Sequence, residues 1–306
     1  MDLRNARYFR EVAQTGSLRK AAERLRIAPS AISRSIALLE EEVGIQLFQR
    51  AGRGMIPTAA GELYMRYVQE ALRNHDLIRT DLADLRGLRR GTIRIVSIEG
   101  VVASFIADVI TRFRQRYPGV VFSLTVAGSN LVSRAIRARD ADLGIGAGSE
   151  DETGLEMVHH IRDPLLAVMS PQHPLAGSQQ LDAVELMRSH PVAVPDPTFA
   201  IRHQLEACCR QARIALEPAL VTNSVDGMRS FARLGGGITF LPWLAIRQDV
   251  AEGRLIGVPV RQAALNKATI NIFTPIGWRL SPSGAEFLKD LKETGDLLMR
   301  SRKRRT

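Results

Sequence analysis

Small polar and basic side chains cluster at the start of one helix-forming segment of the chain. After a short turn at residues 26–28, Pro29 suits the first position of a helix, and Ser30, Ser33 and Arg34 fall on the face opposite the apolar residues. Hydroxyl groups and a guanidinium at the start of an exposed helix can hydrogen-bond to base edges and phosphates in a DNA major groove. The chemistry that these residues favour is therefore nucleic-acid binding.

A glycine-rich segment follows at residues 44–58. Leu47 and Phe48 can anchor it, its glycines can form a turn between two strands, and Arg50 and Arg53 then point outward. Arginines on such a hairpin can reach phosphates or a minor groove. We interpret this segment as the wing of a DNA-binding module.

Three helices, predicted at residues 3–15, 18–25 and 29–42, must position these side chains. Gly16 ends the first helix, and the hydroxyl of Ser17 can cap the second. The third helix turns four apolar residues inward, namely Ile32, Ile36, Leu39 and Val43. The sequence predicts a winged helix-turn-helix over residues 1–58, with these DNA-binding residues: Ser17, Pro29, Ser30, Ser33, Arg34, Arg50 and Arg53.

The net charge of +10 is divided unevenly along the 306 residues. Residues 1–90 hold 16 Lys and Arg against 11 Asp and Glu, residues 91–299 hold 21 of each, and residues 300–306 add five basic side chains. A basic module beside a neutral one indicates a polyanionic partner for the first. The alternatives are a solvated basic face and, for the tail, a solubilising end rather than a phosphate contact.

A long helix is predicted after residue 58, because no proline occurs up to residue 86. Its apolar positions recur at alternating spacings of four and three, which predicts pairing with a second helix. The alternative is an amphipathic helix packed on its own domain. His75 is the one polar residue of this seam. Its side chain is expected to be solvated or hydrogen-bonded, with a pH-sensing role as the alternative. The predicted dimerisation seam is Tyr64, Val68, Ala71, His75, Ile78, Leu82 and Leu85.

Strands and helices alternate after the hinge marked by Gly87 and Gly91, which favours parallel α/β units. Strands are predicted at residues 92–98, 120–126, 142–147, 165–170, 192–195, 219–222, 237–241 and 268–274. Helices are predicted at residues 101–117, 130–139, 199–212, 224–234 and 282–299. Ligands of such sheets bind at the carboxyl ends of the strands.

The chain resembles the LysR-type transcriptional regulators. The N-terminal resemblance rests on these motifs, given in sequence order: Gly16-Ser17, Ala21-Ala22, Pro29-Ser30-Ala31-Ile32-Ser33, Leu39-Glu40, Leu47-Phe48 and Thr58-Ala59-Ala60-Gly61. The C-terminal half is matched more loosely by Arg116-Tyr117-Pro118, Asp140-Ala141-Asp142-Leu143-Gly144-Ile145, Gly235-Gly236-Gly237-Ile238 and Leu241-Pro242.

This resemblance implies an N-terminal winged helix-turn-helix (1–58), a dimerisation helix and hinge (59–90), and an effector domain (91–306) similar to periplasmic solute-binding proteins. Lobe I would comprise residues 91–162 and 268–306, and lobe II residues 163–267, with a small-molecule cleft between them. The implied partners are double-stranded DNA with a pseudo-palindromic operator, further copies of the chain as a dimer or tetramer, and RNA polymerase.

Residues at the predicted strand ends and helix starts are candidates for lining that cleft. A guanidinium such as that of Arg202 and a helix N-terminus would suit a carboxylate effector, whereas Glu99 would repel an acid that lacks an amine or hydroxyl group. The expected effector is a small organic acid or amino acid. The candidate effector-binding residues are Ser97, Glu99, Gly128, Ser129, Gly146, Thr198, Arg202 and Thr222.

Other classes of function find less support. No nucleotide-binding glycine motif or nucleophile elbow is present, and His159 and His160 would point to opposite faces of a strand, so we expect no enzyme, metal or cofactor. The adjacent Cys208 and Cys209 are expected to be structural, with a redox switch as the alternative. A nonspecific architectural DNA binder would not need the neutral domain. Without an apolar run long enough for a membrane span or a signal peptide, the expected location is the cytoplasm.

Overall fold

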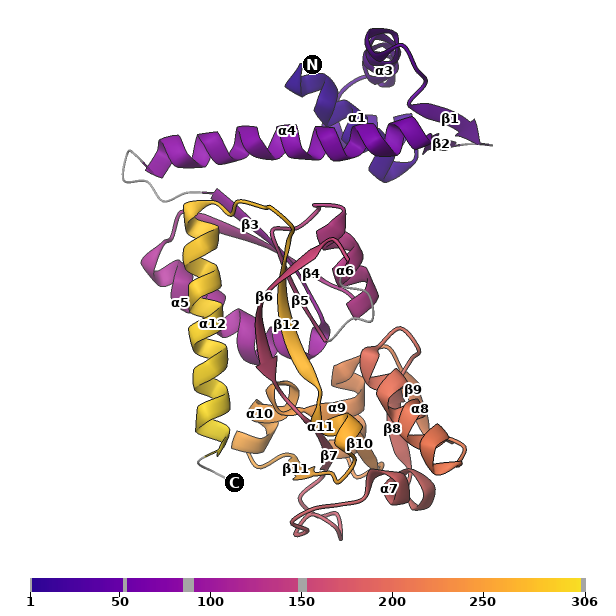
Figure 1. The fold of residues 1–306 in the computed structure, drawn as a ribbon, viewed down its shortest axis with the longest axis vertical. Helices are drawn as coiled ribbons and strands as arrows, with labels where there is room; N and C mark the ends of the chain where they lie inside the picture. The colour runs from indigo at the N-terminus through magenta and orange to yellow at the C-terminus, as the bar shows by residue number, and fades with distance from the viewer. Residues whose placement is uncertain (1, 52–53, 85–90, 148–152, 304–306) are drawn as a thin grey trace. The chain divides into compact units, whose positions relative to one another are not determined.

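The structure of the chain, a computed structural model, describes residues 2–51, 54–84, 91–147 and 153–303. The chain divides into two compact units, Met1–Leu88 and Arg89–Thr306 (Figure 1). Each unit contains hydrophobic cores of its own. None of the described helices is long and apolar enough to span a lipid bilayer.

The first unit is a three-helix module with a hairpin and a long helix. Its elements are α1 (Leu3–Thr15), α2 (Leu18–Leu25), α3 (Pro29–Val43), β1 (Phe48–Ala51), β2 (Gly54–Pro57) and α4 (Ala59–Asp84). The Ser17 hydroxyl caps α2 by accepting from the Lys20 N–H, and Gly16 ends α1 with a left-handed φ of 64°. Three helices and an antiparallel hairpin, β1 with β2, form the winged helix-turn-helix that the sequence predicts.

One core prediction for α3 is wrong. Ile32, Ile36 and Leu39 are buried beside Phe9, but Val43 is 37% exposed. Val43 lies in the last turn of α3, directly before Gly44 takes a left-handed conformation and ends the helix. The helix therefore extends past the core that Leu39 still contacts.

The predicted seam of α4 divides into two parts with different environments. Val68 is fully buried in the core of its own unit, and the Tyr64 ring packs edge-on against Phe9 at 5.1 Å between centroids. Further along the helix, Ile78 and Leu82 are 59% and 56% exposed. The dimerisation prediction is therefore wrong for Val68. Ala71 and His75 are half-buried, and Leu85 lies outside the described residues.

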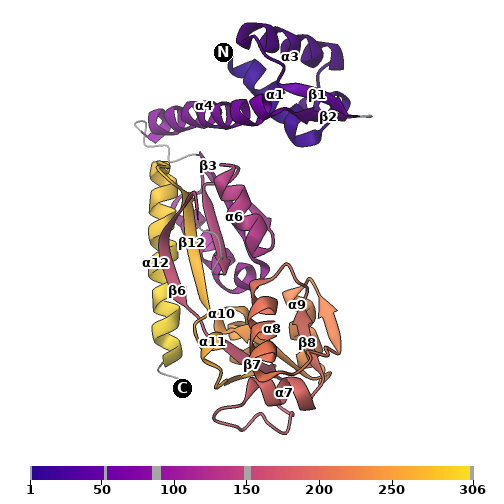
Figure 2. The same ribbon diagram turned by 45° about the vertical axis from the view of Figure 1, so that its right-hand side comes forward.

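Lobe I of the second unit is a five-stranded sheet in the order β4-β3-β5-β12-β6. Its strands are β3 (Gly91–Ser97), β4 (Val120–Val126), β5 (Leu143–Ala147), β6 (Leu155–Arg162) and β12 (Thr269–Pro275). Its helices are α5 (Ala107–Arg116), α6 (Ser129–Arg137) and α12 (Pro282–Lys303). Helix α12 runs along β6 and α5, which brings the C-terminal segment back onto the first strands of the unit (Figure 2).

The continuous helix predicted at residues 101–117 is interrupted at its start. A 3₁₀ turn (Glu99–Val101) and a π-helical turn (Val102–Ile106) precede α5. The Ser104 carbonyl oxygen accepts from Arg247 Nε at 2.6 Å, and its hydroxyl donates to the Leu244 carbonyl oxygen. These contacts with another part of the chain accompany the irregular backbone, and no local sequence pattern reveals them.

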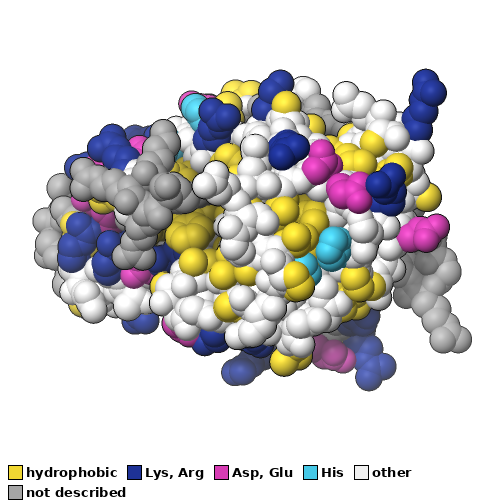
Figure 3. Space-filling view, turned by 90° about the horizontal axis from the view of Figure 1, so that it is seen from below, with side chains coloured by type: hydrophobic (Ala, Val, Ile, Leu, Met, Phe, Trp, Pro, Cys, Tyr) yellow, Lys and Arg dark blue, Asp and Glu magenta, His cyan; other side chains and the backbone are white. Residues whose placement is uncertain are grey.

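Lobe II is a second five-stranded sheet in the order β11-β7-β10-β8-β9. Its strands are β7 (Leu165–Met169), β8 (Val192–Pro195), β9 (Leu220–Thr222), β10 (Ile238–Pro242) and β11 (Ile256–Pro259). Its helices are α7 (Ala183–Ser189), α8 (Ala200–Ala212), α9 (Val225–Arg233), α10 (Trp243–Ala251) and α11 (Ala263–Asn266). The view from below Figure 1 shows both basic and acidic side chains scattered over this face of the molecule (Figure 3).

The parallel α/β units that the sequence predicts are present, since β3 pairs in parallel with β4 and β5, and β8 with β9 and β10, but both sheets also contain antiparallel pairs. Strand β12 runs antiparallel to β5 and β6, and β7 runs antiparallel to β10 and β11. The chain passes from lobe I to lobe II between β6 and β7 and returns between β11 and β12. The strands next to these two crossings are the ones that oppose their neighbours.

Candidate nucleic-acid interface and inter-lobe site

Helix α3 presents the predicted base-reading residues to solvent. Ser30, Ser33 and Arg34 are all exposed, while Ser35 on the inner face is buried and donates a hydrogen bond from its hydroxyl to Asn5 Oδ1 at 2.7 Å. This part-buried hydrogen bond joins α3 to α1 and holds the inner face of α3 against the core. Pro29 occupies the first turn after Ala28, which provides no side-chain cap. The amino end of α3 is thus open and polar.

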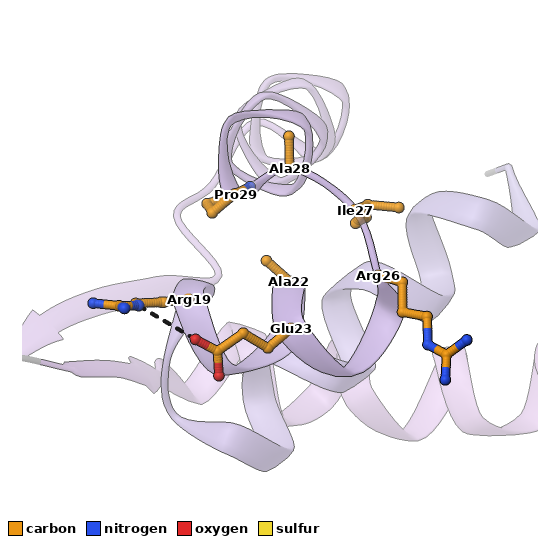
Figure 4. Close-up of a pocket in the computed structure, with 7 residues that line it drawn as sticks. All are labelled: Arg19, Ala22, Glu23, Arg26, Ile27, Ala28 and Pro29. Atoms are coloured by element: carbon orange, nitrogen blue, oxygen red, sulfur yellow. Dashed lines mark hydrogen bonds and ion pairs between the residues drawn. The ribbon is translucent and has the colours of Figure 1, made fainter.

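A shallow hollow of about 420 Å³ borders the amino end of α3 (Figure 4). Arg19 and Arg26 extend outward on opposite sides of it. Arg19 forms an exposed ion pair with Glu23 at 3.3 Å, and Arg26 takes a left-handed φ of 56°. Arg26 was not among the predicted DNA-binding residues, because its position in a turn gives no sign of its orientation. The hollow is lined by Arg19, Ala22, Glu23, Arg26, Ile27, Ala28 and Pro29.

The base of the wing is held from two directions. Glu40 Oε1 on α3 accepts from the backbone N–H groups of Leu47 and Phe48 at 2.8 and 3.0 Å. From the side of α4, the Thr58 hydroxyl donates to the Gln46 carbonyl oxygen at 2.8 Å, and a Cβ at Gly61 would overlap the Leu47 carbonyl oxygen. Arg50 lies on β1 with its side chain outside the described residues, and Arg53 lies outside them altogether.

The candidate effector residues of lobe I lie at the ends of its strands. Ser97 ends β3 and is fully buried, with its hydroxyl donating to the Ile98 carbonyl oxygen at 3.0 Å. Gly128 and the buried Ser129 begin α6, whose first turn has no side-chain cap. Gly146 lies near the end of β5, where a Cβ would contact Val132 of α6 at 3.6 Å.

Two candidates from opposite lobes come together at the start of α6. A Cβ on Gly128 would lie 3.4 Å from the Thr198 carbonyl oxygen and 3.6 Å from its hydroxyl. Thr198 is held by Asp196, whose Oδ1 accepts from the Thr198 N–H at 2.8 Å and from its hydroxyl at 2.5 Å. These hydrogen bonds, led by that from the Thr198 hydroxyl, lower the pKa of the Asp196 carboxyl. The two lobes therefore approach each other at these residues.

Arg202 and Thr222 have partners inside lobe II. Arg202 Nε donates to Glu206 Oε1 at 2.6 Å on the same helix, α8, and its Nη1 lies 3.4 Å from the Pro195 carbonyl oxygen. Thr222 Oγ1 accepts from the Ser224 N–H at 3.2 Å and supports the turn before α9. Neither contact involves lobe I, and a ligand would have to compete with Glu206 for the Arg202 guanidinium.

Glu99 does not hold its charge toward an open cleft. Its carboxylate accepts from the Ser224 hydroxyl and from the N–H groups of Val225 and Asp226, across the boundary between the lobes. The Glu99 carboxylate is therefore not free, because three donors at the amino end of α9 already bind it, and its predicted repulsion of an acidic effector is weaker than for an unpaired carboxylate.

Two buried polar residues were missed by the sequence analysis. Asp163, 1% exposed, accepts from the N–H groups of Trp243 and Leu244 at 2.9 Å each and caps α10 where the chain first crosses between lobes. Asn271, 5% exposed, pairs with Gly146 across β12 and β5, and its Oδ1 has no hydrogen-bond partner within the described chain. The signal that could have drawn attention to it was an amide side chain between two isoleucines, Ile270 and Ile272, in a strand predicted from apolar spacing.

The two adjacent cysteines lie in a hydrophobic core of lobe II. Cys208 and Cys209 are both buried and free, and the Cys209 sulfur lies 3.6 Å from the Met187 sulfur. Burial raises the pKa of both thiols, which disfavours the reactive thiolate. Among the described residues no group of three or more His, Cys, Asp or Glu side chains is arranged to hold a metal ion.

A winged helix-turn-helix with an exposed α3, joined in one chain to a two-lobed α/β unit, is typical of a DNA-binding regulator with a ligand-binding domain. Two family models match the chain. The family model for the bacterial regulatory helix-turn-helix protein of the lysR family matches residues 3–62, and the model for the LysR substrate binding domain matches residues 86–296. The chain therefore belongs to the LysR family of transcriptional regulators, which are not enzymes.

Similar proteins match either nearly the whole chain or its C-terminal domain. The transcriptional dual regulator GltC of Bacillus subtilis is 29% identical over 291 residues, covering 94% of this chain and 95% of that protein. Full-length OxyR from Pseudomonas aeruginosa superposes with a TM-score of 0.72 at 20% identity, covering 97% of this chain and 95% of that one. The effector binding domain of QuiR, solved in complex with shikimate, gives a TM-score of 0.56 at 16% identity, covering 68% of this chain and 98% of that one.

Proposed function

We propose that α3 of this regulator reads base edges in the major groove with Ser30, Ser33 and Arg34, while the wing arginines Arg50 and Arg53 contact the DNA backbone. The observation that carries this assignment is the exposure of all three α3 side chains on a helix whose opposite face is locked to α1 by the bond from Ser35 to Asn5. Small hydroxyls and a guanidinium on the exposed face suit direct readout.

The exposed end of α4 supports pairing of two copies. Ile78 and Leu82 lie one turn apart, and both are more than half exposed. Val68 and Leu72, by contrast, are buried in the core of their own unit. Two paired α4 helices would present two DNA-binding modules to a pseudo-palindromic site. We keep the division into residues 1–58, 59–90 and 91–306 for these roles, with RNA polymerase as a further partner and the cytoplasm as the location.

The inter-lobe site supports a small carboxylate as effector. Helix α6 begins after Gly128, close to Thr198 of lobe II, and has no side-chain cap. The backbone N–H groups of its first turn can therefore donate hydrogen bonds to a bound anion. Asn271 lies on the face of the lobe I sheet that α6 covers, because its register partner Gly146 faces Val132 of α6. Within the described residues the buried Oδ1 of Asn271 has no hydrogen-bond partner, and a ligand hydroxyl or ammonium group would supply one.

A thermal-shift screen of the full chain tests the effector assignment. Small mono- and dicarboxylates with and without hydroxyl or amino groups are compared with neutral sugars and amines. A ligand at 100 times its Kd adds about 2.7 kcal/mol to the unfolding free energy, which is readily seen. The shift should be lost in Asn271→Leu and reduced in Ser129→Ala, and unchanged in Ser123→Ala, an exposed serine of the same lobe. A response to neutral compounds alone would refute a carboxylate effector.

DNase footprinting tests the DNA assignment independently. A bounded protected region with two-fold sequence symmetry is expected on an operator fragment. Uniform protection of any fragment would instead indicate an architectural DNA binder, for which α3 would need no sequence preference.

A further inference from the structure

The Glu99 carboxylate, from lobe I, is bonded to the first turn of a helix in lobe II. Glu99 Oε1 accepts from the Ser224 hydroxyl at 3.1 Å and from the Asp226 N–H at 3.2 Å, and Oε2 accepts from the Val225 N–H at 2.9 Å. All three donors belong to the amino end of α9. One side chain of lobe I thus makes three hydrogen bonds to one helix terminus of lobe II.

The position suits a carboxylate for two physical reasons. The first N–H groups of a helix have no partner within the helix, and its dipole places partial positive charge there. Helix α9 also has a cap of its own, because the Ser224 hydroxyl oxygen accepts from the Gly227 N–H at 3.1 Å. The Ser224 cap, from the same lobe, leaves the Val225 and Asp226 N–H groups without an acceptor, and the Glu99 carboxylate accepts from both.

The surrounding contacts show that this is one edge of the boundary between the lobes. A Cβ on Gly100, the next residue, would lie 3.4 Å from Ala245 Cβ and 3.8 Å from Val225 Cγ1, so the backbone beside Glu99 packs directly on lobe II. On the same edge Arg247 Nε donates to the Ser104 carbonyl oxygen at 2.6 Å. Among these contacts, the Glu99 carboxylate is the one that brings a charge to a helix terminus of the opposite lobe.

We propose that Glu99 is a positioning residue, which sets the placement of lobe II against lobe I by capping α9 from the opposite lobe, and is not an effector ligand. This rests on the proposed function in one respect: an effector that alters the placement of the lobes must act against the hydrogen bonds of Glu99. The proposal makes a prediction that needs no effector, because the α9 terminus is an anion site that Glu99 fills. When Glu99 is shortened, a free carboxylate of the same size should take its place.

The test is chemical rescue in the full-length chain. The substitution Glu99→Ala removes Cγ and the carboxylate, which are the heavy atoms of acetate. We expect amide hydrogen exchange of the segment containing Val225 and Asp226 to become about 5- to 30-fold faster, the factor that loss of a helix cap corresponds to. Sodium acetate should slow it again in a saturable way, while sodium chloride at equal ionic strength should not. Glu156→Ala, which removes an exposed carboxylate of lobe I, should show neither effect.

Unchanged exchange at Val225 and Asp226 in Glu99→Ala, or an acetate effect of equal size in the unmodified chain, would overturn the proposal. If Glu99→Ala does not fold, Glu99→Gln decides, because it keeps one acceptor oxygen but loses the charge. In Glu99→Gln, amide exchange that is faster only in the segment containing Val225 and Asp226, by a smaller factor than expected for Glu99→Ala, supports the positioning role. Exchange at the rate of the unmodified chain refutes it. Failure of this test leaves the carboxylate screen untouched, since that screen depends on α6 and Asn271.

Discussion

Glu40 on α3 accepts a 2.8 Å hydrogen bond from the Leu47 N–H, which lies at the base of the wing. The same oxygen accepts from the next N–H along the chain, and both donors belong to residues that are at most 5% exposed. One carboxylate oxygen therefore ties the helix that carries Ser30, Ser33 and Arg34 to the hairpin that carries Arg50. The spacing between the residues proposed to read bases and those proposed to contact the DNA backbone should therefore depend on Glu40.

Substitution of Glu40 by Ala should free the wing from α3 and so weaken the DNA contacts of the wing. Two buried N–H groups would lose their acceptor, at a cost of about 1–3 kcal/mol each in unfolding free energy. The salt dependence of DNA binding should also become shallower, because the wing arginines no longer reach phosphates together with α3. Glu40→Gln retains the acceptor oxygen and should restore the slope. A Gln variant as impaired as the Ala variant would contradict this explanation.

Alanine substitutions of Arg34 and Arg53 should change DNA binding in different ways. Arg34→Ala is expected to cost about 1–3 kcal/mol on the preferred operator and to relax sequence preference, because a base contact is lost. Arg53→Ala is expected to weaken binding to all sequences alike. Binding titrations against an operator and a scrambled fragment compare the two variants. Equal losses on both fragments for Arg34→Ala would show that this arginine contacts only the backbone.

A charge on the exposed end of α4 should dissociate paired chains. Ile78→Asp places a carboxylate on a residue that is 59% exposed in the single chain, so the fold should persist while helix pairing is lost. Sedimentation velocity should show a lower molecular mass and circular dichroism an unchanged helix content. Leu234→Asp, at an even more exposed leucine of lobe II, is the matched control. Unaltered mass in Ile78→Asp would place the contact elsewhere.

The cysteines should resist oxidation while the chain is folded. Burial raises the pKa of Cys208 and Cys209, so both remain protonated at neutral pH and out of reach of peroxide. DNA affinity should be unchanged after peroxide treatment, and both thiols should label with iodoacetamide only when denaturant is added. Rapid labelling of the native chain would reopen the redox alternative.

Asp182 should make the stability of lobe II depend on pH in acid. The Glu185 N–H, which donates to Asp182 Oδ1 at 3.0 Å, lowers the pKa of this carboxyl, as do hydrogen bonds from Gln262 and the Val184 N–H. A lowered folded-state pKa means that the stabilisation is complete above the unfolded value of about 3.9 and is lost as the pH falls through the lower folded value. Asp182→Ala should cost about 0.5–2 kcal/mol at neutral pH, and less below about pH 4. Urea unfolding across this range measures it, with Asp182→Asn, which keeps the capping oxygen, as the control.

Local sequence patterns were enough to predict the DNA-binding module. Its caps, turns and apolar spacing act over a few residues, so Ser17, Gly16 and Pro29 fix the helix boundaries whatever lies elsewhere in the chain. The same holds for β4 and β8, whose predicted bounds match those observed. Val43 was misplaced because helical periodicity continues to the end of a helix, whereas the core beneath it does not.

The inter-lobe contacts were decided by tertiary structure alone. Glu99 looks like a ligand residue in the sequence, because nothing near it shows that α9, 126 positions later at Val225, supplies its donors. Val68 and Ile78 share one periodic stripe, yet packing against Phe9 buries the first and leaves the second exposed. Periodicity determines which residues share a face, but which partner covers that face depends on segments far away in the chain, whose meeting no local pattern records.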